Sequence, residues 1–200
     1  MGILAILKKK MKKMVHNHRL SRSIAPVPDK FYFPLHPCQS RSDSQQKVLG
    51  WGIHLGLDFD AKEGADVYAA ARGVVVATWY EPGTKEKAGF GHVVVIAHRV
   101  SRKKFIYTLY GHLGKILIKK GEDVSDTDII GTVGKAYTPE NGFWDCHLHF
   151  AIYNGPFPIF TRSGHARMLP GYLDGKTSNY TNLEYWEDPL EFIAKYNRPV

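Results

Sequence analysis

The sequence predicts a mainly β domain that ends in one short helix, and three observations support this prediction. From about Lys47 onward, short stretches rich in β-branched and aromatic residues are separated by turn residues. Glycine is abundant, with 19 residues in a chain of 200, which is typical of a fold with many tight turns. No long segment between Trp51 and Tyr153 repeats its apolar residues at helical spacing.

The first thirty residues differ in charge from the rest of the chain. They carry eight Lys or Arg against the single acid Asp29, whereas the remaining 170 residues carry nineteen bases and eighteen acids. The net charge of +8 therefore belongs mostly to a tail, and the nearly neutral domain is not expected to bind nucleic acid. We interpret residues 1–30 as a solvated, flexible tail and residues 31–46 as a linker.

Within the tail, an apolar run from Met1 to Leu7 precedes five lysines between Lys8 and Lys13. A secretory signal has the reverse order, and no stretch of the sequence has the length and apolarity of a transmembrane segment. Contact of this tail with an anionic membrane surface is the alternative to a freely solvated tail.

Residues 47–200 are expected to form one domain with its core in residues 48–153. The strands expected there are Val74–Thr78, Val93–His98, Lys104–Leu109, Lys115–Lys119 and His147–Ile152. Two similar segments, Gly64–Val67 and Gly121–Val124, each indicate a tight turn that leads into a short strand. Residues 156–182 carry few strand signals and are predicted to be a long loop. Asp188 as N-cap and Pro189 at the first helical position predict a closing helix over residues 188–196.

The first cluster with chemical promise is the segment Gly52–Phe59, which has the pattern G-x-H-x-G-x-D-F. Its apolar residues alternate with His54, Gly56 and Asp58, so His54 and Asp58 share one face of a strand. Four residues of ideal strand span roughly 13 Å, which is too far for two side chains to hold one ion. A bend at Gly56 would bring the two side chains together.

Two further clusters contain histidines. His147 and His149 lie on one face of an expected strand, while Leu148 and Phe150 point into the core. Two neighbouring imidazoles repel each other when protonated, so a metal or a proton-transfer role suits them. His112, in a Y-G-H-L stretch, is expected at the end of a strand, where a loop would aim its ring into a groove.

Together these clusters contain what a catalytic zinc ion requires, which is three His, Asp or Glu ligands and an open position for water. His54, Asp58 and one histidine of the pair would hold the ion. The other histidine and His112 would then transfer protons and stabilise an oxyanion.

The three motifs in this order resemble the lysostaphin/LytM family of zinc metallopeptidases. The intervening glycine pattern and a closing D-P-L-x-F motif at Asp188–Phe192 match as well. The resemblance covers residues 48–153 and the end segment. It implies an antiparallel β-sheet groove (the barrel-sandwich, or duplicated hybrid motif, fold) with loops at its rim.

The resemblance also implies function. It makes His54, Asp58 and His149 the ligands of one zinc ion and gives catalytic roles to His147 and His112, with His147 as the base. The implied activity is hydrolysis of peptide bonds in the stems or cross-bridges of peptidoglycan. The implied location is extracytoplasmic, in the periplasm or cell envelope.

The sequence departs from the family pattern at Asp145-Cys146, where Gly-Pro or Ser-Pro often precedes H-L-H, after a long rim segment from Lys135 to Trp144. Whether Cys146 pairs with Cys38 is open from sequence. We interpret His92 and His98 as structural residues.

Two other functions are compatible with the sequence. An inactive family member would bind wall peptides or activate a partner hydrolase, although such a protein would be expected to lose some of the five key residues, all retained here. A phosphocarrier would need a histidine nucleophile but no Asp at this spacing. Metal content and peptide release separate these possibilities.

Overall fold

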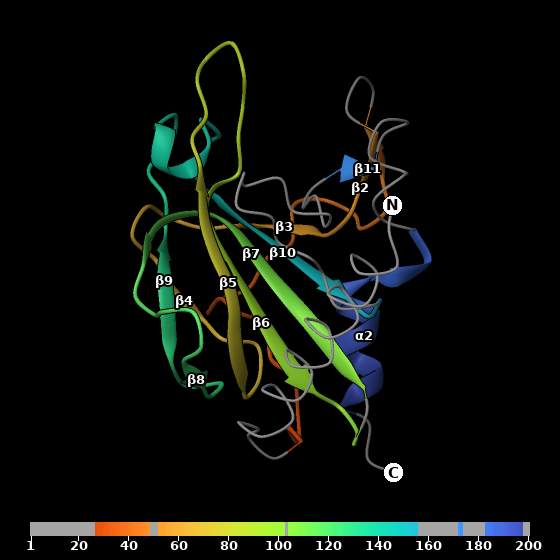
Figure 1. Cartoon of the computed structure of the whole chain (residues 1–200). Coiled ribbons are helices and arrows are strands. Elements are labelled where there is room, and N and C mark those ends of the chain that lie inside the picture. The colour runs from red at the N-terminus through yellow and green to blue at the C-terminus, as the bar shows by residue number, and fades with distance from the viewer. Residues whose placement is uncertain (1–26, 49–51, 103, 156–171, 174–182, 198–200) are drawn as a thin grey trace, which may run out of the picture.

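The computed structural model describes residues 27–48, 52–102, 104–155, 172–173 and 183–197, and an antiparallel sheet dominates them (Figure 1). The strand order along this sheet is β12-β10-β7-β6-β5-β8, while β3 pairs with β10 and β9 pairs with both β4 and β7. Its strands are β3 (Leu57–Asp60), β4 (Asp66–Tyr68), β5 (Gly73–Glu81), β6 (Gly91–Arg99), β7 (Phe105–Ile116), β8 (Asp123–Val124), β9 (Ile129–Val133), β10 (His147–Tyr153) and β12 (Trp186–Glu187). The predicted mainly β, antiparallel fold class is thereby confirmed.

A second, smaller sheet lies beside the first and is built from short strands. Its order is β1-β2-β11, with β1 at Lys47–Val48, β2 at Gly52–His54 and β11 at Tyr172–Leu173. The strand β11 lies inside the segment 156–182 that the sequence predicts to be a loop, so that prediction is wrong at this point. The rest of that segment and residues 1–26 of the basic tail, for which membrane contact is the alternative to a freely solvated tail, lie outside the described residues.

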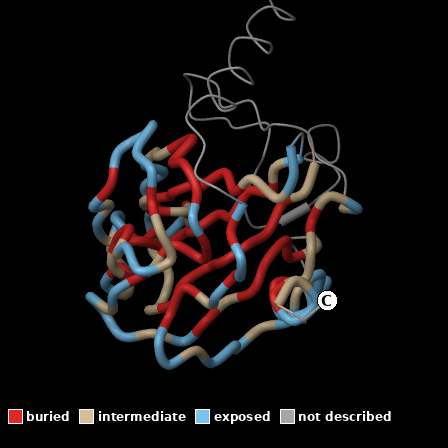
Figure 2. The backbone as a smooth tube through the Cα atoms, turned by 90° about the horizontal axis from the view of Figure 1, so that it is seen from below, coloured by how far each residue is buried: buried red, intermediate tan, exposed pale blue. Residues whose placement is uncertain are grey.

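The large sheet is buried on both faces. In β10, Leu148, Phe150 and Ile152 pack into one hydrophobic cluster, whereas Ala151 and Tyr153 pack into a second cluster on the opposite face. The same alternation runs through β6 and β7. Figure 2 shows the buried residues gathered in the interior of the molecule. Alternation with a period of two residues therefore decides which face each side chain of these strands occupies.

One predicted strand is absent as a separate element. The expected separate strand at Lys115–Lys119 does not exist, because β7 continues without interruption to Ile116. The two predicted turn-and-strand segments do occur: Gly64 and Gly121 have φ angles of 77° and 90° and precede β4 and β8. A positive φ of this size favours glycine.

The chain closes with the helix α2 (Pro189–Tyr196), as the sequence predicts. Asp188 caps it, since its side chain accepts hydrogen bonds from the backbone N–H groups of Leu190 and Glu191. Just after the helix, the Asn197 side-chain amide binds both backbone polar groups of Phe31. The segment interpreted as a linker is thus anchored at this end. Among the described residues, no helix has the length and apolarity needed to span a membrane.

His98 is a buried structural residue of β6. Its Nδ1 lies 2.9 Å from the Arg72 carbonyl oxygen and its Nε2 lies 2.7 Å from Thr108 Oγ1. Because a carbonyl oxygen can only accept, Nδ1 carries the proton of the neutral ring. Burial lowers the pKa of His98 to about 4, partly offset by the bond to Arg72.

This burial predicts an acid dependence of stability. Between pH 6.5 and pH 4 the unfolded chain binds a proton at His98 that the folded protein does not, so the unfolding free energy falls as pH falls. The expected loss between pH 7.5 and pH 5 is about 2 kcal/mol. Denaturant titrations of the wild type and of His98→Gln at both pH values measure it. Equal pH dependence in the two proteins would contradict the prediction.

Candidate metal centre

A bend in the chain brings His54 and Asp58 together. β2 ends at His54 and β3 begins at Leu57, with the bend centred on Gly56. His54 Nε2 lies 3.4 Å from Asp58 Oδ1, far less than an ideal strand would permit. The bend expected at Gly56 is therefore present.

Gly56 has a second reason to be glycine, which concerns packing. A Cβ atom at this position would lie 2.6 Å from the Phe150 carbonyl oxygen and 2.9 Å from His149 Cε1. Contacts this short require the neighbouring backbone to move. The residue between the two candidate ligands thus also allows the strand that carries the third one to approach.

The third candidate ligand comes from β10, which pairs antiparallel with β3 so that His149 lies opposite Asp58. His149 Nδ1 lies 3.1 Å from Asp58 Oδ1 and 3.1 Å from His54 Nε2. Each of the three residues offers a ligand atom, and these atoms all lie within 4.8 Å of one another. The structure therefore brings together His54, Asp58 and His149, the set that the family resemblance implies.

The spacing and charge of these three atoms fit a zinc ion. Nitrogen and oxygen ligands 2.0–2.2 Å from a tetrahedral zinc lie about 3.3–3.5 Å apart, within a few tenths of an ångström of the distances here. Burial opposes ionisation of Asp58, but hydrogen bonds from His149 and His54 hold the pKa of its carboxyl far below the usual range. Burial lowers the pKa of His149 to about 4, so its imidazole is neutral at neutral pH. A carboxylate with two imidazoles is a donor set that zinc prefers.

His112 reaches the same face of the sheet through a β-bulge. The pairing of β6 with β7 shifts register between His92 and Val94, and His112 has a φ angle of 61°. The extra residue breaks the alternation, so Leu113 packs into the core and the His112 ring lies against His147, with ring centroids 4.5 Å apart. The expectation that His112 ends a strand is wrong, because β7 runs through it.

Hydrogen bonds determine which nitrogen of each flanking ring carries the proton. His112 Nδ1 lies 2.9 Å from the Asn141 carbonyl oxygen, and His147 Nδ1 lies 3.0 Å from the Asp145 carbonyl oxygen. Since these oxygens can only accept, both Nδ1 atoms hold hydrogen and both Nε2 atoms keep a lone pair in the neutral rings. His147 Nε2 lies 3.7 Å from Asp58 Oδ1, beside the three candidate ligands.

Burial keeps these two rings neutral. It lowers the pKa of His147, with the Asp58 carboxylate opposing the shift, and it lowers the pKa of His112 well below the usual value, helped by the neighbouring imidazoles. Neutral imidazoles with a free Nε2 are suited to accept a proton near pH 7.

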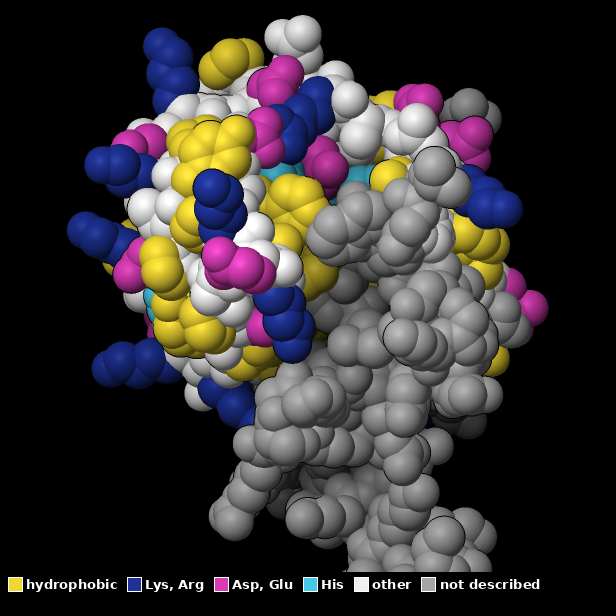
Figure 3. Space-filling model, turned by 90° about the horizontal axis from the view of Figure 1, so that it is seen from above, with side chains coloured by type: hydrophobic (Ala, Val, Ile, Leu, Met, Phe, Trp, Pro, Cys, Tyr) yellow, Lys and Arg dark blue, Asp and Glu magenta, His cyan; other side chains and the backbone are white. Residues whose placement is uncertain are grey.

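A rim loop before β10 supports His112. It contains the 3₁₀ helix η1 (Pro139–Asn141), and the buried Asn141 side chain bonds the backbone of Phe143 and Trp144. Trp144 Nε1 in turn donates to the Gly89 carbonyl oxygen between β5 and β6. Seen from above, histidine side chains are visible between hydrophobic side chains and a group of acidic and basic ones (Figure 3).

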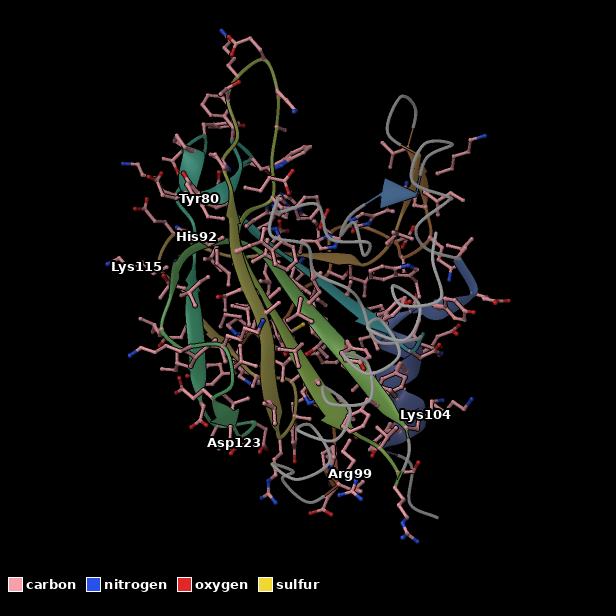
Figure 4. The ribbon with its side chains drawn as sticks, in the orientation of Figure 1. Tyr80, His92, Arg99, Lys104, Lys115 and Asp123 are labelled. Carbon is pink, nitrogen blue, oxygen red and sulfur yellow. The ribbon has the colours of Figure 1, made fainter. Side chains whose placement is uncertain are left out.

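The other residues singled out from the sequence are not among the three candidate ligands. His92 stacks on Tyr80 near the end of the sheet opposite Arg99 and Lys104, as Figure 4 shows. Cys38 and Cys146 are both free thiols, and Cys146 Sγ contacts the Gly134 carbonyl oxygen.

Comparison with known proteins agrees with this geometry. The sequence profile of peptidase family M23 matches residues 52–160, which is more than half of the chain. The chain belongs to peptidase family M23. The match contains all three candidate ligands and the two flanking histidines, His112 and His147. The family resemblance inferred from the motifs is confirmed.

Two curated relatives show what else this M23 chain is similar to. It is 41% identical over 99 residues to the peptidoglycan DD-endopeptidase ShyA of Vibrio cholerae, a match that covers 50% of the chain and 20% of that protein. It is 33% identical over 106 residues to the DD-carboxypeptidase/endopeptidase Mpg of Neisseria meningitidis, a match that covers 52% of the chain and 21% of that protein. The matched region thus spans about a fifth of the length of these relatives.

Solved structures show the same fold. LytU superposes with a TM-score of 0.53 at 23% identity and covers 79% of this chain and 86% of its own. The catalytic domain of lysostaphin from Staphylococcus simulans superposes with a TM-score of 0.52 at 21% identity, covering 80% and 94% of the two chains. The lysostaphin-like fold predicted from the motifs is confirmed.

The sequence analysis did not identify several residues that contact the site. Ser42 Oγ accepts a hydrogen bond from the Asp58 N–H, and the Arg41 N–H donates to the Asp58 carbonyl oxygen. Both precede the region that the M23 profile matches. Asn141 carries no motif signal either, because the group that binds His112 is a backbone carbonyl oxygen, which any residue possesses.

Proposed function

We propose that this M23 chain is a zinc endopeptidase that hydrolyses peptide bonds in the stems or cross-bridges of peptidoglycan. The observation that carries the proposal is the convergence of His54 Nε2, Asp58 Oδ1 and His149 Nδ1 beside two neutral imidazoles. The peptidoglycan substrate, and with it an extracytoplasmic place of action, are proposed from the endopeptidase relatives.

His54, Asp58 and His149 would hold one zinc ion, with the carboxylate as the anionic ligand. When bound, zinc supplies Lewis acidity, which polarises a carbonyl group and lowers the pKa of water to about 7. The residues of the chain then have to move protons and stabilise charge around the scissile bond.

We assign the base to His147, whose Nε2 faces the candidate ligands while its Nδ1–H is held by the Asp145 carbonyl oxygen. Nε2 removes the proton from the attacking water and delivers it to the leaving amine. His112 lies beside it with the same tautomer, so its Nε2 is a second neutral proton acceptor next to the reacting water.

The proposal is tested on purified peptidoglycan sacculi incubated with the zinc-loaded protein. We expect soluble muropeptides whose masses, before and after digestion with a muramidase, show cleavage within stems or cross-bridges. A chelator should stop the release and added zinc should restore it. One bound zinc per chain without any released peptide would contradict the proposal and identify a binding module instead.

A further inference from the structure

Arg41, in the segment before the M23 region, contacts Asp145. Asp145 lies two positions before the proposed base, His147. The Arg41 guanidinium pairs with both carboxylate oxygens of Asp145, with Nη2 lying 3.1 Å from Oδ1. A two-point arginine–carboxylate pair fixes orientation as well as distance. The Arg41 side chain is 26% exposed and that of Asp145 is 49% exposed, so the pair lies at the mouth of the site rather than in the core.

Arg41 is itself tied to the candidate metal ligand. Its backbone N–H donates to the Asp58 carbonyl oxygen at 2.9 Å, and the neighbouring Ser42 Oγ accepts from the Asp58 N–H at 2.8 Å. The guanidinium also lies 3.7 Å from Asp60 Oδ1 on the same strand. One residue therefore links β3, which carries Asp58, to the loop that precedes β10.

Asp145 transmits this link to His147. Its carbonyl oxygen accepts the Nδ1–H of His147 at 3.0 Å, and its carboxylate Oδ1 lies 3.5 Å from the same nitrogen. Asp145 precedes β10 and lies outside its pairing with β3 and β7, which begins at His147. Two side chains hold Asp145 there: Asn141 Nδ2 lies 3.4 Å from its carbonyl oxygen, and Arg41 makes the two-point contact with its carboxylate.

We propose that Arg41 and Asp145 form a positioning pair that holds His147 in the Nδ1–H tautomer, with Nε2 aimed at the reacting water. The inference rests on the proposed function. It assigns no catalytic step to either residue, since both act through His147. It also makes the segment before residue 52 part of the working site, although the M23 profile does not include it.

The kinetic test compares Arg41→Ala, Asp145→Ala and the double variant, all loaded with zinc and assayed by muropeptide release. We expect kcat to fall about tenfold or more in each single variant, with KM and zinc content unchanged, because misorientation of a base affects the chemical step. The double variant should be no slower than the worse single variant, since the two residues act as one unit. Arg41→Lys should recover part of the loss, because it keeps the charge but not the two-point geometry.

Arg99→Ala provides the matched control, because Arg99 lies at the far end of β6 and its side chain bonds only a nearby backbone oxygen among the contacts described (Figure 4). It should keep full activity. An unchanged kcat in Arg41→Ala, or losses that multiply in the double variant, would overturn the positioning pair.

A readout independent of activity is the tautomer itself. Nitrogen-15 spectra of the imidazoles should show His147 protonated at Nδ1 in the wild type and a mixture of tautomers in Arg41→Ala. A single unchanged tautomer in that variant would overturn the inference, whatever the rates. If the wild type releases no peptide, the proposed function fails separately, and the spectra still decide whether the pair orients the ring.

Discussion

Replacing Asp58 by Asn is expected to empty the metal centre and abolish peptide hydrolysis. The substitution keeps the shape of the side chain but removes the anion from a set whose other two members are imidazoles. Asp58 Oδ1 is 3.1 Å from His149 Nδ1 and 3.4 Å from His54 Nε2. A water molecule at this position would not supply the missing negative charge. Metal polarisation is worth several kcal/mol in the transition state, so the rate should fall by about 10³-fold or more.

The measurement combines zinc content per chain, by atomic emission after dialysis, with muropeptide release. His149→Ala should behave in the same way, since it removes another of the three ligands. Asp123→Asn is the matched control, because Asp123 is exposed in β8 at the opposite end of the sheet (Figure 4). Wild-type zinc content in Asp58→Asn would show that the zinc ion is bound at another site.

Much of the centre follows from local sequence rules. In β10 the period of two residues places His147 and His149 on one face and Leu148 and Phe150 in the core, as observed. The G-x-H-x-G-x-D pattern likewise predicts a bend at Gly56. These inferences hold because each depends on a few consecutive residues.

The position of His112 could not be predicted in the same way. Its side chain faces the other histidines because a bulge opposite Val93 inserts one residue into β7, and a bulge is a property of two paired strands. A φ angle of 61° at a histidine gives no signal in the sequence. The sequence predicts that His112 lies at the end of a strand, but the pairing with β6 continues past it.

The contacts of residues 39–46 with the candidate ligands could not be predicted from the sequence for a similar reason. The backbone of this segment bonds His54 and Asp58 along much of its length, and its one isolated strand-like bridge joins Ser40 to Phe59. Main-chain hydrogen bonds are available to any sequence, so polar residues without periodicity indicate a linker. The ion pair between Arg41 and Asp145 spans 104 positions, which no local pattern can show.

Replacing His147 by Ala is expected to leave zinc binding intact and to lower activity by about 10²- to 10⁴-fold, the usual contribution of a general base. His147 lies beside the three ligand atoms, but it is not one of the group that can close around a single ion. Its Nδ1 is occupied by the Asp145 carbonyl oxygen, so the ring presents one lone pair, which the proposal uses for the proton of water.

The pH dependence provides the second half of this prediction. Burial lowers the pKa of His147, so the ring stays neutral below its ordinary value of 6.5, and the wild-type rate should fall only when the pH drops further. Zinc content and the pH profile of muropeptide release, measured on His147→Ala and His112→Ala, separate the two rings. If His147→Ala keeps full activity, the base is not His147. A larger loss in His112→Ala would then assign the base to His112, because its Nδ1 also bonds a backbone oxygen and its Nε2 also keeps a lone pair.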